Sequence, residues 1–96
     1  MQPEMKYIYT VYQCGSFSKA AEKLFLTQPA LSISVQKVEH EVGMPLFNRD
    51  KKPLEITEAG MIYIQKIEQI QHLEQELAMQ LNDLTDLKTG HLRVGG

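Results

Sequence analysis

The chain has 96 residues, of which 43% are apolar and 23% are charged, and it contains a single cysteine, Cys14. This length allows one small domain with an appendage, and it excludes large enzyme folds such as a (β/α)8 barrel or a complete dinucleotide-binding domain. One cysteine excludes an internal disulfide and a cysteine-based metal cluster. The sequence shows neither an 18-residue apolar run nor a secretory signal, so we expect no membrane span and a cytoplasmic location.

Charge is distributed unevenly along the chain, although the formal net charge is only -2. Residues 1–57 contain seven basic and six acidic side chains, a net charge of +1. Residues 58–96 contain three basic and six acidic side chains, a net charge of -3. Because charge selects partners through its local arrangement, the two regions are expected to differ in function.

Two short helices are predicted in the first 24 residues. Apolar side chains in residues 4–13 recur on one helix face, and Gly15 provides the backbone freedom that a helix end requires. A second helix follows, with Ser16 or Ser18 as its N-cap. Its apolar side includes Ala20 and Ala21, whose small side chains let another helix approach closely.

A third helix is predicted to begin after the N-cap Thr27, with Pro29 in its first turn, and to end at Gly43. Apolar side chains at helical spacing form its expected inward face: Leu31, Val35, Val38 and Val42. The opposite face contains smaller polar groups and one isoleucine: Pro29, Ser32, Ile33, Gln36 and His40.

A hairpin is predicted within residues 46–56, where two short apolar segments flank a charged turn. Arg49, Lys51 and Lys52 belong to this turn, which would form a wing that reaches DNA phosphates or the minor groove. An ordinary solvated turn is the alternative, because Asp50 offsets part of the positive charge.

A long helix is predicted from about Glu58 to Lys88, capped by Thr57 and ended by Thr89 and Gly90. At ~1.5 Å per residue it would extend roughly 45 Å, too far for a small domain to bury its whole apolar stripe. We expect a second copy of the chain to cover the stripe; the alternative is a missing domain of the same chain. The expected interface residues are Ile67, Ile70, Leu73, Leu77, Leu81 and Leu84.

Together these elements predict a mostly α fold, a winged helix-turn-helix of three helices and a two-stranded wing at residues 1–57, followed by a dimerisation helix at 58–89. The major groove of B-DNA, about 12 Å wide, admits one helix. Leu31 and its neighbours would hold the third helix from inside, while Gln28, Ser32 and Gln36 would present hydrogen-bonding groups outward. A plain solvated helix face is the alternative.

Four motifs in order resemble LysR-type transcriptional regulators: residues 15–24 (GSFSKAAEKL), 26–32 (LTQPALS), 46–49 (LFNR) and 54–60 (LEITEAG). The resemblance implies a bacterial, sequence-specific binder of double-stranded DNA with a dimerising linker helix and a full-length form that is often tetrameric. It also implies that residues 90–96 begin, with a strand, an effector-binding domain absent from this sequence, which alone would bind a small-molecule inducer.

The resemblance also assigns site residues. Ser16 and Ser18 match positions that cap the second helix against a phosphate, and Arg49 matches the basic residue of the wing. The groove-entering end of the third helix is matched by Thr27, Gln28, Pro29 and Ser32.

Two further positions are candidate DNA contacts. Ile33 stands where the family often has arginine or another polar residue, and we hypothesise that it packs on thymine methyl groups, a contact worth ~1 kcal/mol. Lys37 is also a candidate, with a solubilising role as the alternative.

No metal, cofactor or catalytic site is predicted, and the chain is not expected to be an enzyme. His40, His72 and His91 are far apart in the sequence and show no ligand spacing. Cys14 is expected to be a buried small apolar group, with a redox sensor as the alternative. The alternative function is a protein–protein interaction module that dimerises through its long helix.

Overall fold

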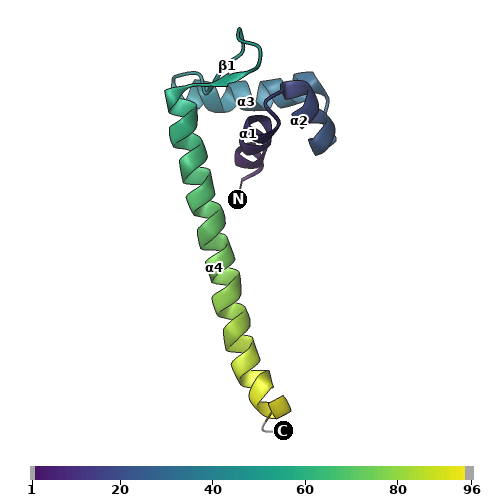
Figure 1. The fold of residues 1–96 in the computed structure, drawn as a ribbon, viewed down its shortest axis with the longest axis vertical. Coiled ribbons are helices and arrows are strands. Elements are labelled where there is room, and N and C mark those ends of the chain that lie inside the picture. Colours follow the sequence, from purple (N-terminus) through teal and green to yellow (C-terminus); the bar gives the residue numbers. More distant parts are fainter. Residues whose placement is uncertain (1, 95–96) are drawn as a thin grey trace.

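In the computed structural model, which describes the backbone of residues 2–94 and the side chains of residues 2–85, the chain forms a small helical domain and one long helix. The elements are α1 (Pro3–Cys14), α2 (Phe17–Leu24), α3 (Gln28–Val42), β1 (Phe47–Asn48), β2 (Glu55–Ile56) and α4 (Glu58–Val94). Figure 1 shows the first three helices and the hairpin gathered at one end of α4, which extends away from them. The molecule is therefore elongated, with principal extents of 62 × 25 × 22 Å.

The predicted helix boundaries follow from local capping. Gly15 adopts a left-handed backbone (φ 66°) and ends α1, and Gly43 (φ 87°) ends α3 in the same way. The Ser16 hydroxyl accepts a hydrogen bond from the Lys19 amide, so Ser16 rather than Ser18 caps α2. Thr27 caps α3 by accepting from the Ala30 amide.

The core lies where α1, α2, α3, β1 and the start of α4 meet. Ala20 and Ala21 are buried, as their small size predicted, and α2 packs closely on α1 and α3. The inward face of α3 is confirmed for Leu31, Val35 and Val38. Val42 was wrongly predicted to face inward: it is the last residue of α3, and its side chain is 43% exposed.

The wing is an antiparallel hairpin in which Phe47 pairs with Ile56 and Asn48 with Glu55. Its base packs against the first turn of α4. A Cβ atom at Gly60 would overlap the Leu46 carbonyl group, so only glycine allows this close approach. The hairpin therefore packs tightly against the start of α4.

Two predictions about α4 are wrong. The helix passes through Gly90 and ends at Val94, because a single glycine weakens a helix by about 1 kcal/mol without ending it and no proline follows. The strand expected at the end of the chain is thus absent over residues 91–94, and Gly95 and Gly96 lie outside the described residues. Ile67 is 1% exposed in the core, so it does not belong to the exposed stripe.

Candidate nucleic-acid interface

A hollow of about 370 Å³ opens between the wing and the N-terminal ends of α2 and α3. Seven candidate residues that lie far apart in the sequence line it together: Ser16, Ser18, Gln28, Ser32, Arg49, Lys51 and Lys52. The fold therefore joins the predicted recognition helix and the predicted wing into one surface. The N-terminal ends of helices favour anions, because their unpaired backbone N–H groups and the helix dipole are positive there.

The serines at the start of α2 have different partners. Ser16 is half-buried and occupied by its capping bond. Ser18 is exposed, and its hydroxyl donates a hydrogen bond to Gln28 Oε1 over 2.9 Å. Ser18 thus contacts the first residue of α3.

Arg49 does not lie at the wing tip as predicted. Its guanidinium stacks 4.4 Å above the centre of the Phe17 ring, and its Nη1 donates to Ser32 Oγ over 2.6 Å. Its Nη2 forms an ion pair with Glu39 Oε1 at 3.2 Å. Because the side chain is only 30% exposed and bonds to two residues of α3, Arg49 attaches the wing to α3.

Glu39 completes this attachment and was not identified from the sequence. Its second oxygen, Oε2, accepts hydrogen bonds from the amides of Leu46 and Phe47 at 2.7 and 3.4 Å. One carboxylate therefore holds both the start of the hairpin and Arg49. The sequence did contain a signal for this role. Glu39 is an acidic residue on a helix expected to approach phosphates, which would repel a carboxylate that had no cationic partner.

Most of the outer face of α3 is exposed, and Ser32 is the residue that Arg49 partly covers. Ile33 is 65% exposed, and Gln36, Lys37 and Pro29 are also exposed. Thr27 is exposed as well, although its hydroxyl is used as the helix cap. Ser32 is half-buried beneath Arg49, so it is less accessible than the sequence suggested.

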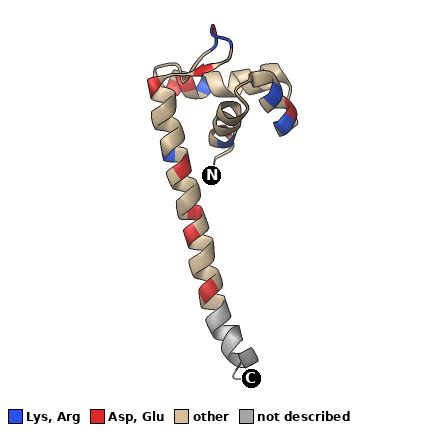
Figure 2. Ribbon diagram, in the orientation of Figure 1, with Lys and Arg blue, Asp and Glu red and all other residues tan. Residues whose placement is uncertain are grey.

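The wing tip presents Lys51 and Lys52, both exposed, beside Asp50. Figure 2 shows Lys and Arg colour on the hairpin loop and on α2, mixed with some Asp and Glu colour, whereas Asp and Glu colour predominates along α4. Positive charge is therefore more frequent at the end of the molecule where α3 is exposed than along α4. This arrangement suits a polyanion that contacts α3 and the wing together.

Residues 3–61 match the family model described as bacterial regulatory helix-turn-helix protein, lysR family. The chain belongs to the LysR family. It is 39% identical over 92 residues to a probable RuBisCO transcriptional regulator of Emiliania huxleyi, covering 96% of this chain and 29% of that protein. The chain thus spans less than a third of that curated relative.

Solved structures agree with this LysR-family assignment. The BenM DBD in its complex with benA site 1 DNA has a TM-score of 0.76 and 30% identity, covering 88% of this chain and 97% of that one. Full-length LysG from Corynebacterium glutamicum with bound effector Arg has a TM-score of 0.78 and 30% identity, covering 88% and 29%. The predicted family and winged helix-turn-helix fold are confirmed, and the family is one of transcriptional regulators.

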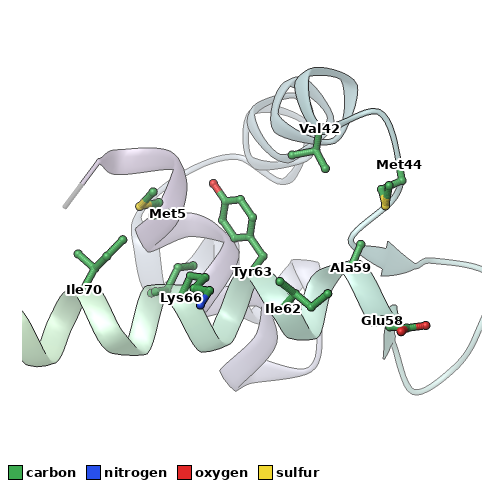
Figure 3. Close-up of a pocket in the computed structure, with 10 residues that line it drawn as sticks. Met5, Val42, Met44, Glu58, Ala59, Ile62, Tyr63, Lys66 and Ile70 are labelled. Carbon is green, nitrogen blue, oxygen red and sulfur yellow. The ribbon is translucent and has the colours of Figure 1, made fainter.

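The LysR-family chain has a second notable surface on α4. Four leucines of the predicted stripe are more than half exposed: Leu73, Leu77, Leu81 and Leu84. Ile70 is half-buried and lines an apolar hollow of about 540 Å³ between α1, the end of α3 and the start of α4. Figure 3 shows Met5, Val42, Ile62 and Tyr63 around this hollow.

Other predicted features have simple structural settings. Cys14 is half-buried and packs against the core. His72 forms an ion pair with Glu76 at 3.3 Å on the surface of α4. Among the described residues there is no cluster of three or more potential metal ligands, and none of their helices is long and apolar enough to cross a bilayer.

Proposed function

We propose that this chain is the DNA-binding part of a transcriptional regulator and recognises sequence by inserting α3 into the major groove of double-stranded DNA. The observation that best supports this function is the joint exposure of the outer face of α3 and the wing lysines around one hollow. Gln28, Ser32, Ile33 and Gln36 are the proposed base-contacting residues, and Ile33 is proposed to pack on thymine methyl groups.

Phosphate contacts would supply most of the affinity. Lys51 and Lys52 extend from the wing, Lys37 from α3, and the capped N-terminal ends of α2 and α3 open toward the same side. Because binding by these groups releases counterions, affinity should fall steeply as salt concentration rises. The net charge of only +1 in residues 1–57 predicts modest affinity for a single domain.

A second copy of the chain is the proposed partner for α4. The exposed leucines Leu73, Leu77, Leu81 and Leu84 follow the apolar hollow along the same helix. Antiparallel pairing of two α4 helices would bring the leucines of each copy against the hollow of the other, whereas parallel pairing would leave both hollows open. Such a twofold dimer would present two α3 helices to half-sites about 34 Å apart.

The proposed division of labour is DNA binding by residues 1–57 and dimerisation by residues 58–89. Effector binding is placed outside this chain, because the curated relative is more than three times as long as the segment that matches. We propose a cytoplasmic, non-enzymatic protein that needs no metal or cofactor for this function. Tetramer formation would belong to the full-length protein.

Selection of bound duplexes from a random pool tests this function. We expect pseudo-palindromic sites, relaxed base preference in Gln28→Ala and Ser32→Ala, and a uniform loss of affinity in Lys52→Ala. In the Lys52→Ala chain, the slope of the logarithm of the binding constant against the logarithm of the salt concentration should also be smaller in magnitude by about 1, because one phosphate contact is lost. Uniform losses from all three variants would contradict base recognition by α3.

Two further measurements complete the test. Ile33→Ala should relax preference at one thymine and leave the other positions unchanged. If the parent chain binds no duplex even at low salt, the result would instead favour a protein–protein interaction module. Both proposed functions include the dimer through α4.

A further inference from the structure

The hydrogen bond between Ser18 and Gln28 fixes the orientation of an amide at the entrance of the proposed groove site. Gln28 is the first residue of α3, is exposed, and lines the hollow beside the wing. Ser18 lies on α2, whose start is held by the Ser16 cap. The bond of 2.9 Å therefore joins the two helices of the helix-turn-helix through side chains.

This bond determines which polar atom Gln28 presents. A glutamine amide has one acceptor oxygen and one donor nitrogen with two hydrogens. Because Ser18 donates to Oε1, the oxygen is turned toward α2. The amide nitrogen, on the other branch of the same planar group, is left as the outward donor.

Ser32, one helical turn further along α3, also has its acceptor oxygen occupied. Its Oγ accepts a hydrogen bond from the positively charged Arg49 guanidinium at 2.6 Å. A hydroxyl that accepts from a cation retains its own hydrogen for donation, and the nearby positive charge opposes a second donor. Gln28 and Ser32 thus both present donors.

Guanine and adenine differ in how well they accept hydrogen bonds from these donors. In the major groove guanine presents two adjacent acceptors, N7 and O6, whereas adenine presents an acceptor at N7 and a donor at N6. The bidentate glutamine–adenine pair needs a free amide oxygen facing the base. We infer that Gln28 selects guanine over adenine, and that Ser18 is the positioning residue that sets this preference by holding Gln28 Oε1.

This inference rests on the proposed DNA-binding function, and one experiment separates the two. Duplexes bound by the 96-residue chain are selected from a random pool, and the base contacted by Gln28 is located as the position that loses preference in Gln28→Ala. At that position we expect guanine to be favoured over adenine by about tenfold, within the range of one good base contact. Replacement of this guanine by 2-aminopurine paired with thymine, which keeps N7 but lacks O6, should remove most of the preference, because N7 is common to guanine and adenine and only the group at position 6 differs.

Ser18 variants supply the decisive comparison. Ser18→Ala frees Gln28 Oε1, so the ratio of guanine to adenine at this position should fall by about tenfold. Ser18→Thr keeps a hydroxyl and should retain the parental ratio. A lost phosphate contact or a looser fold would lower affinity for all duplexes without moving this ratio.

Three results would overturn the inference. These are a parental preference for adenine, unchanged affinity when 2-aminopurine replaces the guanine, and an unchanged base ratio in a Ser18→Ala chain that is still folded by circular dichroism. If Ser18→Ala does not fold, the parental base ratio and the 2-aminopurine result decide alone. A parent chain that retains no duplex at all overturns the proposed function, and this inference with it.

Discussion

The winged domain and the distal half of α4 use the same apolar side chains in opposite ways. In the domain and the start of α4 that packs on it, Leu31, Leu46 and Ile64 are at most 1% exposed. In α4, Leu73 and Leu77 are 61% and 57% exposed. Because burial of apolar surface is the main stabilising contribution to folding, the domain and the start of α4 already share a buried core, whereas the distal half of α4 leaves apolar side chains that the proposed dimer would bury.

Charge divides the molecule along the same boundary. Lys and Arg colour is frequent on the wing and α2, whereas Asp and Glu colour predominates along α4 (Figure 2). The end that exposes α3 can therefore approach a polyanion while the acidic helix is kept away from it. Hydrophobic and electrostatic patterns together support the proposal that one region contacts DNA and the other self-associates.

The largest effect is expected from truncating the core of the winged domain. Leu31→Ala removes a fully buried side chain from α3 and should lower the free energy of unfolding by about 3 kcal/mol. Urea unfolding followed by circular dichroism measures this loss. Leu77→Ala is the matched control, because the same atoms are removed from an exposed helix position. An equal loss from both variants, at concentrations where the chain is monomeric, would abolish the contrast between the regions.

The next largest effect concerns association through α4. Leu77→Gln and Leu81→Gln should each raise the dimer dissociation constant by about tenfold to a hundredfold, because burying a leucine contributes about 1.5–3 kcal/mol. Sedimentation equilibrium measures the constant. Gln80→Ala, on an exposed position between these leucines, is the control and should leave it unchanged. Dimers of parental strength in both leucine variants would contradict the proposed interface.

The sequence predicted the winged domain well because its rules are local. Glycine and proline positions, hydroxyl caps and helical spacing act over a few residues, and these placed all three short helices. The exposed α3 face followed from periodicity, because Leu31, Val35 and Val38 fix which side is inside. The hollow beside the wing could be outlined in the same way, since its residues belong to those elements.

The sequence did not predict features that depend on contacts between residues far apart in the chain. Arg49 was expected at the wing tip because spacing alone cannot show that Phe17 and Glu39 lie beside it. Ile67 was assigned to the exposed stripe because the same periodicity describes a core face and an interface face. The end of α4 was misplaced because a glycine is a common helix end but not a sufficient one.

A smaller effect is expected where Arg49 attaches the wing. Arg49→Met removes the bonds to Ser32 and Glu39 and should lower the free energy of unfolding by about 1 kcal/mol, since the group is partly solvent-screened. Hydrogen exchange at the Leu46 amide, which donates to Glu39, should become faster. Lys51→Met removes an exposed cation of the same hairpin and should change neither quantity. A stability loss of equal size in Lys51→Met would show that general charge, not the attachment, is measured.

The smallest effect lies at the junction of the two regions, on Tyr63. Burial in the apolar hollow raises the pKa of the Tyr63 phenol above its ordinary value of 10.0, and the charges of Glu4 and Glu41 raise it further. A raised pKa means that the fold favours the neutral phenol. This contribution to stability is therefore complete below pH 10.0 and is lost as pH rises through the higher folded-state pKa.

Unfolding free energies measured from about pH 8 to 11 should decline less in Tyr63→Phe than in the parent chain, and the titration of lysines is common to both chains. If a second copy covers the hollow, the difference should grow at concentrations where the dimer forms, whereas a difference that is independent of concentration would place Tyr63 outside the dimer interface.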